Sequence, residues 1–235
     1  METYTIDADN IDRDLFFYNL TRNSNDFSML PVFELDRIAQ KIRNILKKHG
    51  SRKDIILNHR ELQEAFFNPF KPQLKTVQVF LSHSHADKNK ALGVKDYLES
   101  KTKRKVFIDS LFWDYKDDVL NKLAKYDDIS KIEDAFTLIL RESLQDMIEK
   151  CPYFVFLQSK NSVSNQGLSR NQVLLKITYS AWIYEELKIA HSISAISESH
   201  LIPMMESMQV FHDVSPFLES FETIRLSELS RIINS

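Results

Sequence analysis

The chain has 235 residues, of which 43% are hydrophobic and 27% are charged, and its formal net charge at pH 7 is -2. A charge this close to zero gives no general attraction to nucleic acids or anionic membranes. The single cysteine, Cys151, cannot form a disulfide within the chain, so we expect a cytoplasmic protein. No apolar run approaches the roughly 20 residues that cross a bilayer, and the acidic start METYTIDADN lacks the apolar segment of a secretory signal.

The chain contains only three glycines, Gly50, Gly93 and Gly167, and no two of them are close in the sequence. The G-x-G-x-x-G dinucleotide loop and the G-x-x-x-x-G-K-[ST] phosphate loop are therefore both excluded. A nucleotide would have to be bound through helix N-termini, side chains and aromatic stacking.

Residues 1–72 are predicted to form an N-terminal helical extension. Hydrophobic residues recur at helical spacing in FELDRIAQKIRNILKKHG, two lysines occupy the last turn, and Gly50 follows as a C-cap. The stretch HRELQEAFF predicts a second short helix. The rigid segment NPFKPQ, with two prolines, then marks a boundary.

Residues 75–235 alternate between short β-rich runs and helical segments. The predicted strands are VQVFL, KVFID, YFVFLQS, HLIPMM and FETIRL. This alternation predicts an α/β domain with a parallel sheet and helices on both faces, in which ligands bind beyond the carboxyl ends of the strands. Residues 111–135 and 160–178 interrupt the alternation, and we expect them to be long loops.

The stretch VQVFLSHSHADK allows two interpretations. His83, His85 and Asp87 spell H-x-H-x-D, which begins the metal-binding motif of the metallo-β-lactamase superfamily. That motif continues with another histidine, but this chain has Lys88 there, and its next histidine is His191. A metal-dependent hydrolase is therefore an alternative that we do not favour, and we expect no metal.

The favoured interpretation is a buried strand that runs into a polar turn and then a helix. Ser82, His83 and Ser84 would emerge at the carboxyl end of the strand, where they are candidates for ligand contact. Asp87 would cap the helix that begins near Lys88.

Four fragments, in this order, resemble bacterial Toll/interleukin-1 receptor (TIR) domains. VFLSHSHADK resembles their first strand and turn, KVFIDS their second strand, and IEKCPYFVFLQSKNSVSNQ their third helix and strand. SAWIYEEL is similar to the S-x-W-x-x-x-E-L segment that carries the catalytic glutamate of the enzymatically active members. The resemblance covers residues 75–205, and residues 1–70 have no recognised counterpart.

The resemblance implies a flavodoxin-like fold with five parallel strands and an enzyme that cleaves NAD+ at the nicotinamide-ribose bond. NAD+ would be the substrate, and no cofactor is implied. The product would be ADP-ribose, a cyclic ADP-ribose isomer or an ADP-ribose conjugate, used as a signal in bacterial antiphage defence. The resemblance also implies a homo-oligomer, a phage-derived trigger and a separate effector protein that responds to the product. The alternative within the family is a non-enzymatic TIR scaffold.

The chemistry suits a single glutamate. Glu186 and Trp182 are four residues apart and share one face of the predicted helix, whereas Glu185 lies about 100° around it. Nicotinamide leaves NAD+ as a neutral molecule, so no general acid is needed. One carboxylate can stabilise the positive charge that develops on the ribose. We therefore predict Glu186 as the catalytic residue.

The predicted substrate-binding residues lie at strand ends and on the same helix as the glutamate. Trp113, soon after the second strand, would line the pocket or an interface. Asp109 and Ser159, at the ends of the second and third strands, are alternatively explained as turn or cap residues. The full set is Ser82, His83, Ser84, Asp109, Trp113, Ser159 and Trp182.

Overall fold

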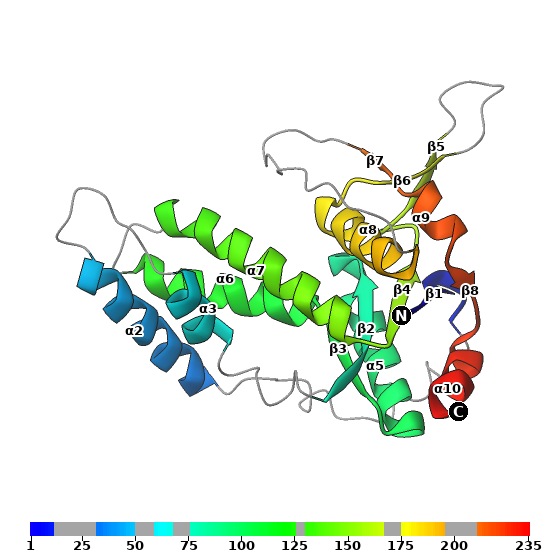
Figure 1. Cartoon of the computed structure of the whole chain (residues 1–235), viewed down its shortest axis with the longest axis horizontal. Coiled ribbons are helices and arrows are strands. Elements are labelled where there is room, and N and C mark those ends of the chain that lie inside the picture. Colours follow the sequence, from blue (N-terminus) through cyan, green and yellow to red (C-terminus); the bar gives the residue numbers. More distant parts are fainter. Residues whose placement is uncertain (12–31, 50–58, 68–75, 126–129, 167–174, 196–210) are drawn as a thin grey trace. The chain divides into compact units, whose positions relative to one another are not determined.

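The computed structural model describes residues 1–11, 32–49, 59–67, 76–125, 130–166, 175–195 and 211–235. The chain divides into two compact units (Figure 1). The sheet unit comprises Met1–Arg22, Val77–Asp109 and Gln145–Ser235. The helical unit comprises Asn23–Thr76 and Ser110–Leu144. This division differs from the expected one. The predicted extension, residues 1–72, is split between the two units, and so is the predicted α/β domain, residues 75–235.

The sheet unit is built on a five-stranded, all-parallel sheet with the strand order β3-β2-β4-β1-β8. The prediction of an α/β protein with a parallel sheet is confirmed. Three predicted strands are present as β2, β3 and β4, and FETIRL contributes only the short β8. The predicted strand HLIPMM lies outside the described residues. The bounds are β1 (Glu2–Asp7), β2 (Val77–His83), β3 (Lys105–Ile108), β4 (Tyr153–Gln158) and β8 (Glu222–Thr223).

Strand β1 is the main departure from the predicted fold. It pairs with β4 along its whole length, from Glu2 opposite Tyr153 to Asp7 opposite Gln158, and it also pairs with β8. Its central residues Tyr4, Thr5 and Ile6 are all buried. Residues 1–72 are therefore not a purely helical extension, because their first residues form an interior strand of the sheet.

The centre of the sheet is a continuous apolar layer. All four residues from Phe154 to Leu157 in β4 are buried. Across neighbouring strands, the ring of Phe80 stacks on that of Phe154 with a centroid distance of 5.6 Å and packs against Phe107 at 5.5 Å. An uninterrupted apolar run is typical of parallel strands that are covered on both faces.

The helices of the sheet unit form two groups by their contacts. Helix α5 packs on β2 and β3 and contacts α10, whereas α8 contacts β1 and β2. A second, antiparallel sheet has the order β5-β6-β7, and β6 leads into α8. The expected loop at 160–178 therefore contains two short strands. The bounds are η1 (Ala8–Asn10), η3 (His85–Asp87), α5 (Lys88–Thr102), β5 (Ser164–Gln166), β6 (Leu175–Thr178), α8 (Ala181–Ala195), β7 (His212–Asp213), α9 (Ser215–Glu219) and α10 (Leu226–Asn234).

The helical unit packs α2 (Val32–His49) against α3 (His59–Phe67) and α6 (Ser110–Ala124). It also contains the first part of α7 (Ser130–Lys150), and the rings of Phe66 and Phe136 lie 5.1 Å apart. The two predicted helices of the extension are confirmed as α2 and α3.

The prediction of a long loop at 111–135 is wrong, because most of this stretch is helical. Val119, Leu120 and Leu123 recur at helical spacing and are buried, while the acidic residues Asp117 and Asp118 are exposed. The many acidic residues led to the prediction of a loop, although the apolar residues follow the amphipathic pattern that is typical of a helix with one buried face.

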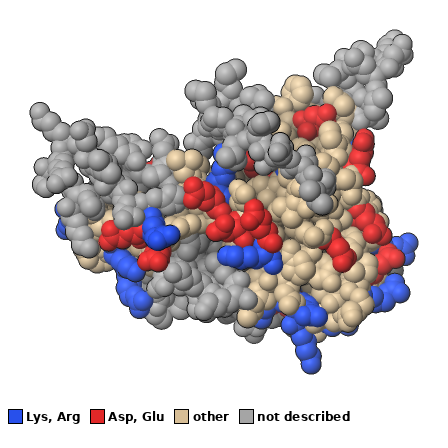
Figure 2. Space-filling view, in the orientation of Figure 1, with Lys and Arg blue, Asp and Glu red and all other residues tan. Residues whose placement is uncertain are grey.

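The surface carries both signs of charge. On the visible face of the described residues, acidic and basic side chains both occur, in keeping with the net charge of -2 (Figure 2). Among the described helices, none is both long enough and apolar enough to cross a membrane.

The lone thiol of Cys151 should be unreactive in the folded protein. It is 2% exposed, and burial raises the pKa of the Cys151 thiol to about 12. Because the thiolate is the reactive form, a colorimetric disulfide reagent at pH 8 should modify the native protein at least about a hundredfold more slowly than the urea-denatured protein. Equal rates in the two states would contradict this burial.

Candidate functional site

Four polar side chains meet at the carboxyl ends of β2 and β3. Ser82 and His83 end β2, Asp109 directly follows β3, and Glu186 lies in the second turn of α8. All four are buried, and the hydroxyl of Ser82 donates a hydrogen bond of 2.5 Å to Oε2 of Glu186. This group, the Glu186 cluster, occupies the edge at which open parallel sheets bind their ligands.

His83 and Asp109 are close neighbours within the cluster. Nδ1 of His83 lies 3.0 Å from Oδ1 of Asp109, and the His83 side chain is completely buried. Neither of these two atoms has a partner with hydrogen-bond geometry among the described residues, so the contact is a close electrostatic one rather than an aligned hydrogen bond. A buried polar group without an aligned partner is costly and is often found at functional sites.

Glu186 is the most completely buried carboxyl group of the cluster. It is 0% exposed and lies on the apolar side of α8, between Ile183 and Ala190. Burial raises the pKa of Glu186 well above its ordinary value, the nearby Asp109 charge raises it further, and the hydrogen bond from Ser82 only partly offsets both. The protonated form is therefore favoured, and Oε1 has no hydrogen-bond partner among the described residues.

Three further predicted site residues are not among the four that define the Glu186 cluster. Trp182 is half-buried, one turn before Glu186 on α8. Ser84 is half-buried, and its carbonyl accepts the backbone N–H of Asp87 at 2.8 Å. Trp113 belongs to α6 in the helical unit, and its side chain lies outside the described residues.

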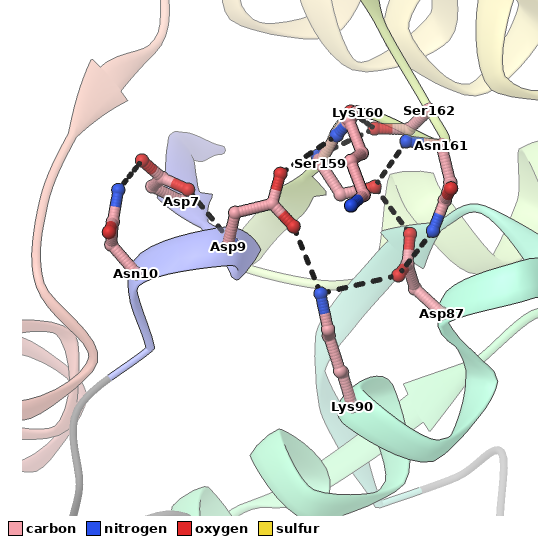
Figure 3. Close-up of polar contacts among 9 residues, drawn as sticks. All are labelled: Asp7, Asp9, Asn10, Asp87, Lys90, Ser159, Lys160, Asn161 and Ser162. Atoms are coloured by element: carbon pink, nitrogen blue, oxygen red, sulfur yellow. Dashed lines mark hydrogen bonds and ion pairs between the residues drawn. The ribbon is translucent and has the colours of Figure 1, made fainter.

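Ser159 belongs to a second polar group, the Asp87 network (Figure 3). Its hydroxyl donates to Oδ2 of Asp87, and Nδ2 of Asn161 donates to Oδ1 of the same carboxylate at 3.0 Å. Asp87 stands at the N-cap position of α5, as predicted, but its side chain makes no capping hydrogen bond. The carboxylate instead accepts hydrogen bonds from the turn after β4.

The Asp87 network extends to the residues after β1. Nζ of Lys90 lies 3.1 Å from Oδ1 of Asp9 and 3.5 Å from Oδ1 of Asp87, and the backbone N–H of Lys160 donates to Oδ2 of Asp9 at 3.0 Å. This N–H and the Lys90 ammonium lower the pKa of Asp9. The network thus ties together the polar ends of three strands, and Ser159 is one of its members.

The H-x-H-x-D residues do not converge. His83 is buried against Asp109, Asp87 is buried against Ser159, and His85 is exposed. Within the described part of the chain, no three His, Cys, Asp or Glu side chains are placed to hold a metal ion.

The protonation of Glu186 should make stability depend on pH. Because its pKa is raised above the ordinary 4.5, the folded chain retains a proton that the unfolded chain releases. Stability is therefore lost as the pH rises from about 4.5 through the raised pKa. At pH 8 the Glu186→Gln variant, which has no charge to bury, should unfold with a free energy about 1–3 kcal/mol higher than the wild type.

Urea unfolding between pH 4 and pH 9 measures this difference. It should shrink toward pH 4, where the wild-type side chain is protonated in both states. Glu228→Gln, on an exposed residue of α10, is the control. A difference for Glu186→Gln that stays constant with pH would contradict the buried proton.

Comparison of the chain with protein-family models gives no match, and neither the curated proteins nor the solved structures yield one.

Proposed function

We propose that the sheet unit is a TIR-type NAD+ nucleosidase that cleaves the nicotinamide-ribose bond, with Glu186 as the catalytic residue. The observation that carries the proposal is the position of Glu186. It is fully buried on α8, hydrogen-bonded to Ser82 at the end of β2 and next to Asp109 at the end of β3. A carboxyl group held there, in a low-dielectric site, acts strongly on a developing positive charge.

The strand order supports a flavodoxin-like fold for this unit. Flavodoxin-like sheets have the order 2-1-3-4-5. With β2 as the first strand, β3, β2 and β4 occupy the places 2-1-3, and β8 occupies the last place. The fourth place is filled by β1 from the N-terminus, where the family pattern has a strand that follows the catalytic helix.

The chemistry requires Glu186 in its ionised form. As nicotinamide departs, the ribose acquires positive charge, and the carboxylate stabilises that charge while it accepts a hydrogen bond from a ribose hydroxyl. The hydroxyl of Ser82 fixes Oε2, which leaves Oε1 for the substrate. Because Glu186 is fully buried, the substrate has to displace the groups that cover it. Trp182 is half-buried on the same helix, and we assign it to the wall of the pocket.

The proposal includes the partners that the TIR resemblance implies. The chain would act as a homo-oligomer, respond to a phage-derived trigger and produce a nucleotide signal for a separate effector protein. Light-scattering mass of the active protein tests the first of these, and a fully active monomer would contradict it.

The experiment that tests the enzyme is direct. Purified protein is incubated with NAD+, with and without extract of phage-infected cells, and the products are separated by chromatography. Release of nicotinamide supports the proposal, and the second product identifies hydrolysis, cyclisation or conjugation. No nicotinamide under either condition would contradict it and favour the non-enzymatic scaffold.

A further inference from the structure

His83 is a buried base that the proposed chemistry does not use. It ends β2 with its imidazole completely enclosed, and Nε2 has no hydrogen-bond partner among the described residues. Within the described part of the chain, Nδ1 of His83 approaches Oδ1 of Asp109 to 3.0 Å. Because the imidazole is enclosed and lies next to Asp109, we expect it to act on Asp109 rather than on a substrate.

Asp109 links His83 to Glu186. It lies against the imidazole on one side, and its charge opposes ionisation of Glu186 on the other. Two neighbouring buried carboxyl groups cannot both ionise unless a positive charge compensates them. Across the described residues, no lysine or arginine makes an ion pair with either carboxyl group, and His83 is the base in contact.

Charged residues on the other elements that pack against α8 do not supply this compensation. Among the described elements, those with the most extensive packing against α8 are β1, β2, β6 and α9. The charged residues of β1, β6 and α9 are exposed or half-buried, and none of them contributes to the raised pKa of Glu186. They are Glu2, Asp7, Lys176 and Glu219. On α8 itself, Glu185 is buried and Lys188 is half-buried, and neither contributes to the raised pKa of Glu186.

We propose that His83 is the positioning residue that allows Glu186 to ionise, by pairing as an imidazolium with the Asp109 carboxylate. His83 keeps its proton as long as it faces the Asp109 carboxylate, and Glu186 releases its own proton to solvent. The imidazolium cancels the repulsion between the two carboxylates. This inference rests on the proposed function only for its catalytic consequence, because the ionisation of Glu186 is itself a property of the cluster.

Carboxyl ¹³C NMR on glutamate-labelled protein measures the ionisation of Glu186 without any substrate. The signal of Glu186 is identified by its loss in Glu186→Gln, and the pH midpoint of its titration is measured. His83→Gln removes the base, so the midpoint should rise by about one pH unit or more. Asp109→Asn removes the repelling charge, so the midpoint should fall by a similar amount. His85→Gln, on the exposed histidine two residues further along, should leave it unchanged.

The same variants give a second readout in the pH profile of nicotinamide release. The rising limb should move to higher pH in His83→Gln and to lower pH in Asp109→Asn, with activity recovered once Glu186 is ionised. A general loss of structure would lower activity at every pH and would not produce opposite shifts.

The outcomes separate this inference from the function on which it builds. Opposite movements of the Glu186 midpoint support it, even when the wild type releases no nicotinamide. Unchanged midpoints, or movements in the same direction in both variants, would overturn it. Circular dichroism establishes that each variant is folded, and if His83→Gln does not fold, an unchanged or raised midpoint in Asp109→Asn overturns the inference alone.

Discussion

Glu186→Gln should lower NAD+ cleavage by about a hundredfold to a thousandfold while the chain stays folded. Glutamine retains the shape of the side chain and can still accept the hydrogen bond from Ser82, but it cannot carry the negative charge that stabilises the ribose cation. The loss should therefore appear in kcat more than in KM, because the charge acts in the transition state. Initial rates of nicotinamide release over a range of NAD+ concentrations measure both constants.

Glu185→Gln is the matched control for this experiment. Glu185 is the adjacent residue of α8, is 3% exposed, and has the same side chain. Its substitution should change the rate of nicotinamide release only a few-fold. The reverse result, in which Glu185→Gln abolishes cleavage and Glu186→Gln does not, would move the catalytic role to the neighbouring carboxylate.

The Glu186→Gln variant, a chelator and the His85→Gln variant together distinguish the alternatives. A scaffold that works by assembly would keep its cellular function in Glu186→Gln. A metal-dependent hydrolase would lose activity in a chelator and in His85→Gln, since the H-x-H-x-D motif needs that histidine. An enzyme of the proposed type should be insensitive to both treatments.

Local sequence patterns were sufficient to predict most of the parallel sheet. β2, β3 and β4 are short apolar runs whose residues bury together, and their alternation with helices predicts that they are parallel. β1 escaped prediction because TYTID, with two threonines between the apolar residues, is a weak strand signal in a polar context. Its partner β4 begins about 150 residues later, and no local pattern reports such a pairing.

The Glu186 cluster was partly predictable for a related reason. Ser82 and Asp109 end predicted parallel strands, so their meeting follows from the topology, and Glu186 follows from the resemblance of its helix. The sequence did not show which other side chain each of these side chains contacts. Ser159 also ends a strand, but it turns toward Asp87, and the contributions of Asp9 and Lys90 to that network depend on β1.

Deleting residues 1–10 should unfold the sheet unit. β1 lies between β4 and β8, so its removal turns β4 into an unprotected edge and takes from β8 the one strand with which it pairs among the described residues. Two large buried side chains, Tyr4 and Ile6, are lost with it. Each truncation of a large core side chain costs about 2–5 kcal/mol, against a total stability of about 5–15 kcal/mol for a typical domain.

Single substitutions in β1 isolate the contribution of its buried side chains to the free energy of unfolding. Ile6→Ala should lower the free energy of unfolding by about 2–5 kcal/mol, because Ile6 is 2% exposed. Thr3→Ala, on a half-buried residue of the same strand, should cost less than about 1 kcal/mol. Urea unfolding followed by circular dichroism measures both, and hydrogen exchange of the β4 amides reports whether the deletion releases the sheet.

The deletion also tests how the candidate site is supported. Asp9 follows β1 and anchors Lys90 and the backbone of Lys160, so loss of β1 should loosen the turn after β4 as well as the sheet. Asp9→Ala keeps the strand and removes only this anchor, so it should leave the sheet folded while the Lys160 amide exchanges faster. A chain without residues 1–10 that keeps native exchange protection in β4 would contradict the interior position of β1.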